Sequence, residues 1–268
     1  MMSLPQTRHL ALDLADGVLR VTLDRPDVSN ALNGEMVEEL AATVEAIRDD
    51  RSVRALVLQG RGRHFCAGAD LKSIAGDSGA EARSRVVAFN RRFGEVLARI
   101  DSAPQAVAVV AQGAALGGGF GLLCVSDIAV VTRDAKMGMP ETRLGLPAAQ
   151  ILPFVVARIG LTQARRIAMC GLRFDGAEAY RLGVAHELAD DADDAASRLE
   201  SVLADIRACA PGANAATKQI LGALGVAPTP ELLDTAAERF ADCLTGDEGR
   251  EGTRAFTEKR PPSWVSDQ

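Results

Sequence analysis

Hydrophobic residues form two short runs near the start of the chain. The runs His9 to Leu14 and Val18 to Leu23 are separated by Ala15-Asp16-Gly17. Two short apolar segments joined by a turn that contains Asp and Gly predict a β-hairpin. We therefore expect the chain to begin with sheet.

Helix and strand patterns then alternate. Apolar residues recur at helical spacing from Glu35 to Arg48, and a short apolar strand follows at Ala55 to Leu58. The alternation continues with a predicted helix at 83–100, a buried strand at 106–111, a glycine-led helix at 116–124 and a strand at 128–131. This order is typical of an α/β fold.

The pattern becomes mainly helical after Pro140, with predicted helices at 151–159, 161–169, 176–182, 195–209 and 232–244. Asp175 with Glu178 matches a capping box, and Thr229-Pro230-Glu231 predicts an N-cap followed by proline in the first turn. The acidic run 190–194 indicates a domain boundary near residue 200, or only a solvated entrance to a helix.

Composition excludes several classes of function. With 268 residues and 47% hydrophobic content, the chain can bury a substantial core, and a net charge of -6 argues against nucleic-acid binding. Five cysteines, odd in number and never in a Cys-x-x-Cys pair, predict reduced thiols. The absence of a signal pattern and of a membrane-length apolar run favours the cytoplasm. The three histidines lack metal-ligand spacing, so no metal is predicted.

Three segments carry candidate chemistry. In Arg61 to Lys72, small residues at Gly68 and Ala69 can turn a backbone N–H toward a carbonyl oxygen, while the basic side chains can meet phosphates. In Gln112 to Gly121, three consecutive glycines after a buried strand predict a helix N-terminus that holds an anion. The alternatives are a glycine turn among solvated charges and close helix–sheet packing without a ligand.

The third segment runs from Met137 to Gly145 and places one carboxylate, Glu141, among Met, Pro, Leu and Gly. Burial there raises a carboxyl pKa toward the range useful for proton transfer, whereas a surface turn leaves it unchanged. Ser126 lacks a Gly-x-Ser-x-Gly context, which argues against a serine hydrolase.

Taken together, Gly-Ala-Asp-Leu-Lys, Ala-Leu-Gly-Gly-Gly and Met-Pro-Glu resemble the crotonase superfamily, the enoyl-CoA hydratases and isomerases. Leu23-Asp24-Arg25-Pro26, Asn30-Ala31-Leu32 and the terminal Phe256 to Arg260 extend the resemblance over nearly all the chain. It implies that the N–H groups of Ala69 and Gly118 polarise a thioester carbonyl and that Glu141 moves the proton. It also implies a substrate site with Gly68, Asp70, Leu71, Lys72, Gly117, Arg143, Gln150 and Lys259.

Two departures from the family pattern affect the expected reaction. Gly121 occupies the position where the family's hydratases usually carry a first glutamate, and the stretch 146–154 replaces a glycine-rich one. Gly-Gly-Gly-Phe-Gly with Pro-Ala-Ala-Gln-Ile resembles the branch that hydrates isohexenylglutaconyl-CoA in acyclic terpene degradation. The second carboxylate of that substrate would meet Arg143 or Gln150. For CoA, the resemblance implies Arg61, Arg63 and Lys72, with Lys259 from the C-terminal region or a neighbouring subunit, unless Lys259 belongs to a solvated tail.

The resemblance implies a crotonase-like ββα superhelix, an α/β spiral core at 1–200 with the acyl-CoA site, followed by a helical trimerisation region at 201–268. It implies homotrimers or hexamers, an acyl-CoA substrate and no separate cofactor, because coenzyme A belongs to the substrate. The predicted activity is hydration of a 2-enoyl-CoA. The alternatives are a double-bond isomerase that uses Glu141 alone and a catalytically silent acyl-CoA-binding scaffold.

Overall fold

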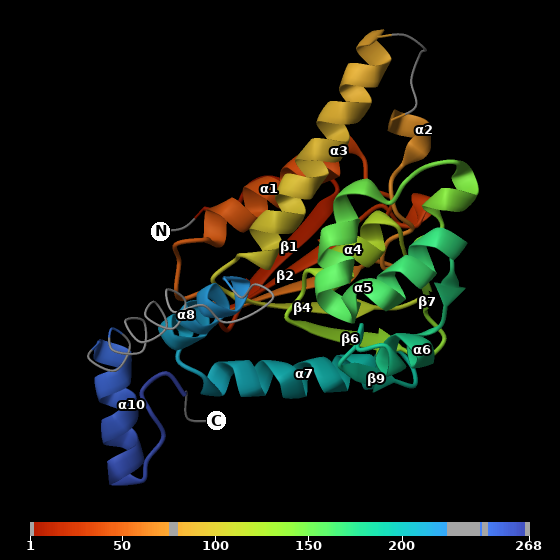
Figure 1. Cartoon of the computed structure of the whole chain (residues 1–268). Helices are drawn as coiled ribbons and strands as arrows, with labels where there is room; N and C mark the ends of the chain where they lie inside the picture. Colours follow the sequence, from red (N-terminus) through yellow and green to blue (C-terminus); the bar gives the residue numbers. More distant parts are fainter. Residues whose placement is uncertain (1–2, 75–79, 224–241, 243–245, 266–268) are drawn as a thin grey trace.

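A six-stranded sheet forms the centre of the computed structural model, which describes residues 3–74, 80–223, 242 and 246–265 (Figure 1). The strand order is β1-β2-β3-β4-β6-β9. β1 (Leu10–Ala15) and β2 (Val18–Leu23) pair antiparallel as the predicted hairpin. The other strands run parallel to β2, and these are β3 (Ala55–Gly60), β4 (Ala106–Ala111), β6 (Ile128–Thr132) and β9 (Glu187–Ala189).

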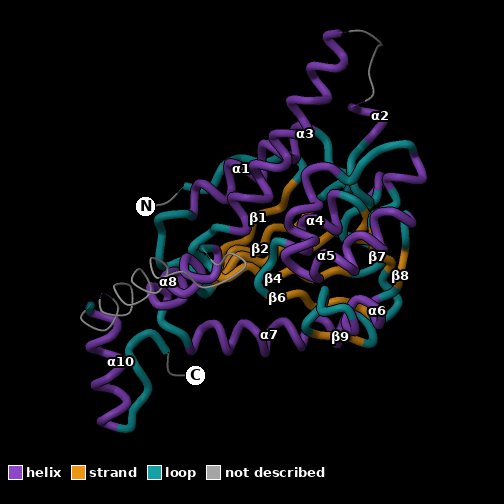
Figure 2. The backbone as a smooth tube through the Cα atoms, in the orientation of Figure 1, coloured by secondary structure: helices purple, strands orange, loops and turns teal. Residues whose placement is uncertain are grey.

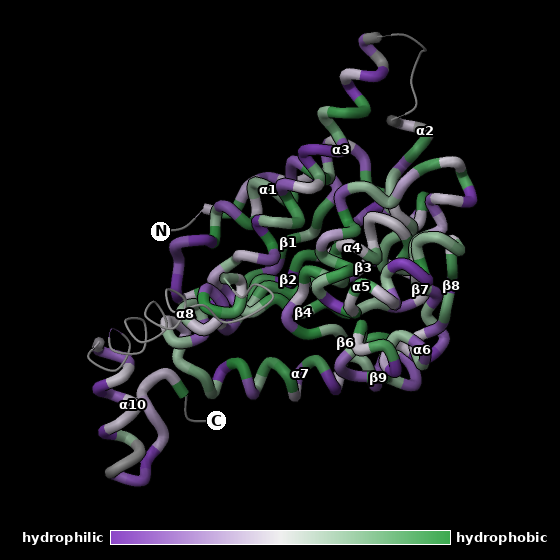
Figure 3. Tube along the Cα trace, viewed as in Figure 1, coloured by the Kyte–Doolittle hydropathy of each residue, from purple (hydrophilic) through white to green (hydrophobic). Residues whose placement is uncertain are grey.

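Helices cover both faces of this sheet, which confirms the predicted α/β class (Figure 2). α1 (Gly34–Ile47) and α3 (Ala80–Asp101) pack together on one side. The side chain of Asn33 caps α1 by accepting a hydrogen bond from the N–H of Met36. α7 (Ala192–Ala208) lies on the other side, where its apolar residues contact β2, β3 and β4. Figure 3 shows hydrophobic residues along the central strands and an alternation of hydrophobic and hydrophilic residues along α7.

A second, three-stranded sheet has the order β5-β7-β8. β5 (Ala114–Leu116) pairs parallel with β7 (Lys136–Gly138), which pairs antiparallel with β8 (Arg173–Phe174). α4 begins just after β5 and spans Gly118–Cys124, so the predicted helix at 116–124 starts two residues too early. Residues 114–116 are extended because their backbone pairs with β7, a contact that local hydrophobic spacing does not report.

The chain after Gly138 is mainly helical, as predicted. Besides α7 and the short strands β8 and β9, the elements described there are η2 (Glu141–Leu144), η3 (Ala149–Ile151), α5 (Leu152–Cys170), α6 (Gly176–Arg181), α8 (Pro211–Gly222) and α10 (Asp247–Glu258). The two helices predicted at 151–159 and 161–169 form one element, α5, with non-helical backbone at Gly160. The predicted helix at 232–244 and its cap at Thr229 lie outside the described residues, except for residue 242. Asp175 caps α6 through the N–H of Glu178, as predicted.

The acidic run at 190–194 forms the entrance to α7, where the side chain of Asp191 accepts a hydrogen bond from the N–H of Asp194. The domain boundary predicted near residue 200 falls within this helix and stays a prediction. Two short elements nearer the start, η1 (Pro26–Val28) and α2 (Leu71–Ile74), border the segments described below.

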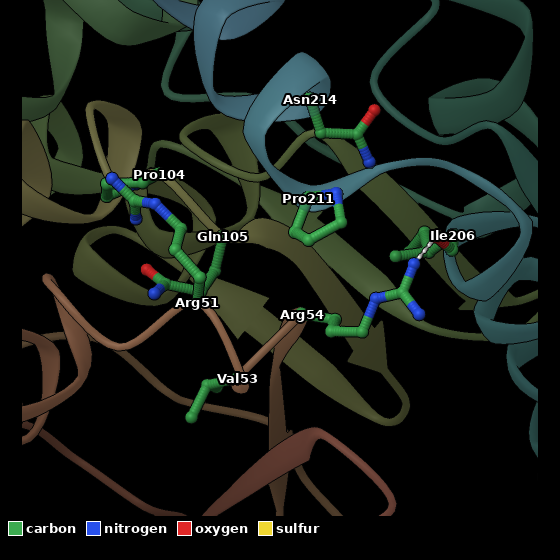
Figure 4. A pocket seen from close by; sticks show the side chains of 8 residues that line it. All are labelled: Arg51, Val53, Arg54, Pro104, Gln105, Ile206, Pro211 and Asn214. Carbon is green, nitrogen blue, oxygen red and sulfur yellow. Dashed lines mark hydrogen bonds between the residues drawn. The ribbon is translucent and has the colours of Figure 1, made fainter. Parts of the chain in front are cut away.

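Arg54 joins the sheet to the C-terminal helices (Figure 4). Its guanidinium donates hydrogen bonds to the carbonyls of Ile206, Arg207 and Cys209 at the end of α7, and to that of Trp264. The first three carbonyls lie at the C-terminal end of α7, the negative end of the helix dipole, where a cation is stabilising. The small pocket beside Arg54 is lined by Arg51, Val53, Pro104, Gln105, Ile206, Pro211 and Asn214.

Two findings concern the chain as a whole. Of the cysteines in the described residues, Cys66 and Cys124 are buried and free, and Cys170 and Cys209 are exposed and free, in line with the prediction of reduced thiols. In the described part of the chain, every helix is too short or too polar to cross a membrane.

Candidate active site

Three segments from different parts of the chain run side by side toward one place. An isolated parallel bridge joins Cys66 to Ala115, so the segment that leads to Ala69 lies beside β5. β5 and β7 pair in parallel with Leu116 opposite Gly138. Parallel pairing carries the three segments in the same direction, and each ends at a predicted site residue: Ala69, Gly118 and Glu141.

The first segment presents the backbone N–H of Ala69. Gly68 has φ +101°, which favours glycine, and a Cβ there would lie 2.9 Å from the carbonyl oxygen of Leu116. The same added Cβ would lie 3.7 Å from the backbone nitrogen of Gly118, so the two predicted donors, the N–H groups of Ala69 and Gly118, are close neighbours. Among the backbone hydrogen bonds of the described residues, none uses the N–H of Ala69.

The second segment presents the N-terminus of α4. Gly117 precedes this helix with φ +51° and ψ -118°, and its N–H donates to the carbonyl of Gly138 at 3.0 Å. Gly118 is the first residue of the helix, and the first helical hydrogen bond runs from Gly121 N–H to the Gly117 carbonyl. The N–H of Gly118 therefore remains available for a ligand at the positive end of the helix dipole.

The third segment places the Glu141 carboxylate against Gly117. A Cβ on Gly117 would lie 2.9 Å from Glu141 Oε1, and within the described residues the buried Oε2 has no hydrogen-bond partner. Burial raises the pKa of the Glu141 carboxyl above its ordinary value, although a hydrogen bond from its own backbone N–H opposes the shift. Two N–H donors beside a carboxyl with a raised pKa can hold a developing oxyanion while a proton moves.

Apolar side chains surround these polar groups. A Cβ on Gly118 would lie 2.8 Å from Leu32 and 3.3 Å from the ring of Phe93. One turn further along α4, a Cβ on Gly121 would collide with Ile151 Cγ2. Ile151 thus fills the space that a side chain at position 121 would need. Gly121 stands where the family's hydratases usually carry a first glutamate, and its packing partner Ile151 fills the space of that side chain. The described site therefore contains one carboxylate.

Gln150 and Arg143 differ in where the structure places them. Gln150 lies against α3, where a Cβ on Gly94 would collide with its side-chain amide. Gly94 follows Phe93 on α3, and η3, which contains Gln150, packs against both α3 and α4. Arg143 instead contacts Gly171, and its guanidinium donates to the carbonyl of Cys170 at 3.4 Å. The structure thus places Gln150 against α3 and directs Arg143 to the end of α5.

The basic residues predicted for CoA are distributed unevenly. Arg61 pairs with Asp24 at 2.6 Å, whereas Arg63 is exposed. Leu71 and Lys72 begin α2, but the side chain of Lys72 lies outside the described residues. Lys259 follows α10, which lies away from α4 across the molecule (Figure 1). Within one chain, Lys259 is therefore not brought to the other site residues.

The sequence alone does not identify three contributors to this site, Phe93, Gly94 and Ile151. Gly94 carries a signal, because an isolated glycine within a helical pattern often marks close packing. The contact of Ile151 with Gly121 carries none, because it depends on how η3 packs on α4.

Comparisons with known proteins agree with this geometry. The family model for enoyl-CoA hydratase/isomerase matches residues 13–267. AtuE of Pseudomonas aeruginosa is 53% identical, with a TM-score of 0.93, covering 97% of this chain and 100% of that one. An enoyl-CoA hydratase/isomerase from Marinobacter aquaeolei is 45% identical, with a TM-score of 0.92 and coverage of 96% and 99%. An enoyl-CoA hydratase from Shewanella pealeana is 32% identical, with a TM-score of 0.88 and coverage of 97% of both chains.

The match extends over nearly the whole chain and includes all three segments that meet at Glu141. Sequence and fold lead to the same family, since the solved relatives at 32–53% identity share the architecture described above. The chain belongs to the enoyl-CoA hydratase/isomerase family, the crotonase superfamily, and is an enzyme of that family.

Proposed function

We propose that this enzyme adds water to a 2-enoyl-CoA through a thioester enolate. The observation that carries this proposal is that two backbone N–H groups, at Ala69 and Gly118, have no partner among the described residues and lie beside the partly buried carboxyl of Glu141. The water oxygen bonds to C3 as one of its protons passes to Glu141. The C2–C3 π electrons form the C1–C2 double bond of the enolate while the carbonyl π electrons move onto the thioester oxygen, and the proton then passes from Glu141 to C2 as the carbonyl re-forms. The N–H groups favour the enolate because negative charge grows on the oxygen they face.

Glu141 is the residue proposed to move the proton. A carboxyl with a raised pKa exchanges protons near neutral pH more readily than an ordinary glutamate. Oε2 supports this role, because this buried oxygen has no hydrogen-bond donor among the described residues and can bond to a water or a substrate hydrogen. Gly117 and Gly68 are proposed to let the acyl chain approach this carboxylate.

The substrate proposed is a branched, glutaconyl-type acyl-CoA such as isohexenylglutaconyl-CoA. Gln150 supports this choice, since its amide lies against Gly94 of α3, next in sequence to Phe93, and can bond to a second carboxylate or to the attacking water. The exposed Leu71 and Val86, on the adjoining helices α2 and α3, offer apolar contact to a long acyl tail. Arg143 is the weaker candidate partner, because its guanidinium is directed to the Cys170 carbonyl.

A double-bond isomerase is the second candidate function. The contact of Ile151 with Gly121 favours it, because a hydratase of the usual type holds its water between two carboxylates. An isomerase needs one carboxylate to carry a proton between two carbons of a dienolate. A silent acyl-CoA-binding scaffold would share the oxyanion hole and lack turnover.

Product analysis in labelled water separates these functions. Panels of 2-enoyl-CoA and 3-enoyl-CoA esters, including branched and dicarboxylic ones, are incubated with the enzyme in H₂¹⁸O and in D₂O. We expect ¹⁸O in a 3-hydroxyacyl product and the best turnover with a glutaconyl-type ester. Deuterium without ¹⁸O would indicate the isomerase. Tight binding without either label across the panel would indicate the scaffold.

The oxyanion hole is tested by a matched pair of variants. Gly118→Pro deletes the N–H at the first helical position, where proline is tolerated. Gly118→Ala keeps the N–H and adds the same Cβ beside Leu32. We expect Gly118→Pro to lower kcat about 100- to 1,000-fold relative to Gly118→Ala, as for loss of one oxyanion donor. Equal kcat values in two folded variants would refute the assignment.

The assembly proposed is a homotrimer or hexamer in the cytoplasm, with residues 201–268 as the trimerisation region and no cofactor apart from the CoA of the substrate. Lys259 and Asp70 are proposed to face CoA, with Lys72 and Lys259 as phosphate partners. The position of Lys259 away from α4 suits a contribution to a neighbouring subunit. Light scattering after size exclusion measures the assembly of the wild type and of Lys259→Ala. A Lys259→Ala protein that assembles normally but binds CoA more weakly separates a role in CoA binding from a role in assembly.

A further inference from the structure

The backbone around Ala69 is held by Leu32. The N–H of Leu32 donates to the Gly68 carbonyl at 2.8 Å, and the N–H of Asp70 donates to the Leu32 carbonyl at 2.8 Å. These bonds occupy groups on both sides of Ala69 and leave its own N–H for a ligand. The aim of that N–H therefore depends on where the segment ending at Leu32 is held.

The segment that ends at Leu32 contains a strained turn. Ser29 and Asn30 have φ +55° and +54°, values that residues other than glycine rarely adopt. The side chain of Asn30 is fully buried and donates to the carbonyls of Arg61 and His64. It also accepts a hydrogen bond from the N–H of Arg25. Such a turn persists only where its surroundings hold it by several independent contacts.

The guanidinium of Arg25 crosses this turn and reaches the oxyanion segment. Its Nη1 donates to the Ala31 carbonyl at 2.5 Å, and its Nη2 donates to Asp70 Oδ2 at 3.0 Å. The two charged side chains are only 17% and 16% exposed. Ala31 and Asp70 are the immediate neighbours of Leu32 and Ala69, so one planar group joins both segments beside the bridge between them.

Asp70 also connects the Arg25 guanidinium to α2. Its second oxygen, Oδ1, accepts a hydrogen bond from the N–H of Ser73, and its carbonyl accepts one from the Ser73 hydroxyl. With Arg25 on one carboxylate oxygen and Ser73 on the other, the carboxylate is held from two directions. A mostly buried carboxylate that loses its cation is left with an uncompensated charge, which favours turning it toward water and moving the backbone that carries it.

We propose that Arg25 is a positioning residue for the oxyanion hole, which aims the N–H of Ala69 through its joint hydrogen bonds to Ala31 and Asp70. This inference rests on the proposed function of Ala69 as a donor. In the described contacts, the Arg25 guanidinium reaches Ala69 only through its neighbours, by way of Ala31 and Asp70. Its effect belongs to the transition state, where charge on the thioester oxygen is greatest, so it should act on kcat more than on KM.

The test combines Arg25→Met, Asp70→Asn and the double variant with a surface control, Arg99→Met. The Arg99 guanidinium pairs with Glu45 at 3.1 Å on exposed parts of α3 and α1, far along the chain from the turn. kcat and KM are measured for each variant. The infrared carbonyl stretch of a bound enoyl-CoA carrying ¹³C at the thioester carbonyl reports polarisation directly, because hydrogen bonding to the oxygen lowers its frequency.

We expect Arg25→Met to lower kcat about 10- to 100-fold, as for a displaced catalytic geometry, with little change in KM. The carbonyl stretch should shift toward that of the free ester. Asp70→Asn should give a similar loss of kcat, with its KM compared separately because Asp70 is also proposed to face CoA. In kcat, the double variant should be no worse than the stronger single variant, since both remove one restraint. Arg25→Lys, which cannot span both acceptors, should recover part of the activity, and Arg99→Met should match the wild type.

A folded Arg25→Met enzyme with wild-type kcat and carbonyl stretch would overturn the proposal, as would losses that simply add in the double variant. If Arg25→Met does not fold, the same readouts on Asp70→Asn and Arg25→Lys decide. Gly118→Pro serves as the reference for the site itself. Loss of polarisation in Gly118→Pro alone would reject only the role of Arg25, whereas unchanged polarisation in both variants would reject the proposed oxyanion hole.

Discussion

Replacing Gly117 by alanine adds one methyl group at the point where the oxyanion hole meets the proton carrier. The backbone there has φ +51° and ψ -118°, a conformation that costs an L-residue about 1–3 kcal/mol. The new Cβ would also lie 2.9 Å from Glu141 Oε1, which is too close for carbon and oxygen, so the carboxylate must move. Gly117→Ala should therefore lose both stability and activity.

The magnitudes follow from these two effects. The strain should lower the free energy of unfolding by about 1–3 kcal/mol, with about 2–4 °C in Tm for each kcal/mol at this chain length. Displacement of Glu141 should lower kcat about 10- to 100-fold, since a misplacement of about 1 Å can cost about 100-fold. kcat is followed by the loss of the enoyl-thioester absorbance, and stability by urea unfolding.

Gly183→Ala is the matched control. Gly183 also has a positive φ, +76°, but a Cβ there would meet nothing within 4 Å. It should lose stability through backbone strain alone and keep its kcat. The reasoning is refuted if folded Gly117→Ala retains wild-type kcat, or if Gly183→Ala loses as much kcat as Gly117→Ala.

Three further predictions address the carboxylate, its missing partner and the thiols. Because the pKa of Glu141 is raised in the folded state, its contribution to stability is lost as the pH rises through that pKa. Urea unfolding at a series of pH values should therefore show Glu141→Gln gaining stability relative to the wild type as the pH rises. A stability difference between the two proteins that stays constant with pH would contradict this. Gly121→Glu should lower the free energy of unfolding by about 1–3 kcal/mol, because the new side chain overpacks against Ile151, and it should gain no hydratase activity. Adding Ile151→Ala should recover stability. A Gly121→Glu single variant that hydrates faster than the wild type would oppose this account. Burial raises the pKa of the Cys66 and Cys124 thiols to about 12, so a thiol reagent should label them only after unfolding. Mass spectrometry detects the label, and rapid labelling of either cysteine in the native protein would be contrary evidence.

Much of the fold was predictable because hydrophobic spacing reports burial on one face of an element. The strand predicted at 106–111 matches β4, and the hairpin around Asp16 and Gly17 forms as expected. The three-stranded sheet was not predicted. β5 and β7 have three residues each and exist because they pair with each other, a tertiary contact that outweighs the local helical pattern at Leu116.

The candidate site was only partly predictable from the residues of the sequence. Each glycine-rich segment indicated an anion-binding backbone, but the convergence of Ala69, Gly118 and Glu141 came from the resemblance to the family. Parallel pairing supplies its physical reason. Contacts between side chains distant in sequence remained hidden, because the packing of Ile151 on Gly121 and the reach of Arg25 to Asp70 depend on the finished fold.

The central claim is that the oxyanion hole stabilises a thioester enolate while Glu141 carries its proton. Exchange of the α-hydrogens of a saturated acyl-CoA in D₂O, followed by NMR, tests it without requiring a hydration step. The account predicts enzyme-catalysed exchange in the wild type that is lost in Glu141→Gln and strongly slowed in Gly118→Pro, with Gly118→Ala much less affected. Exchange at the wild-type rate in folded Glu141→Gln would contradict it.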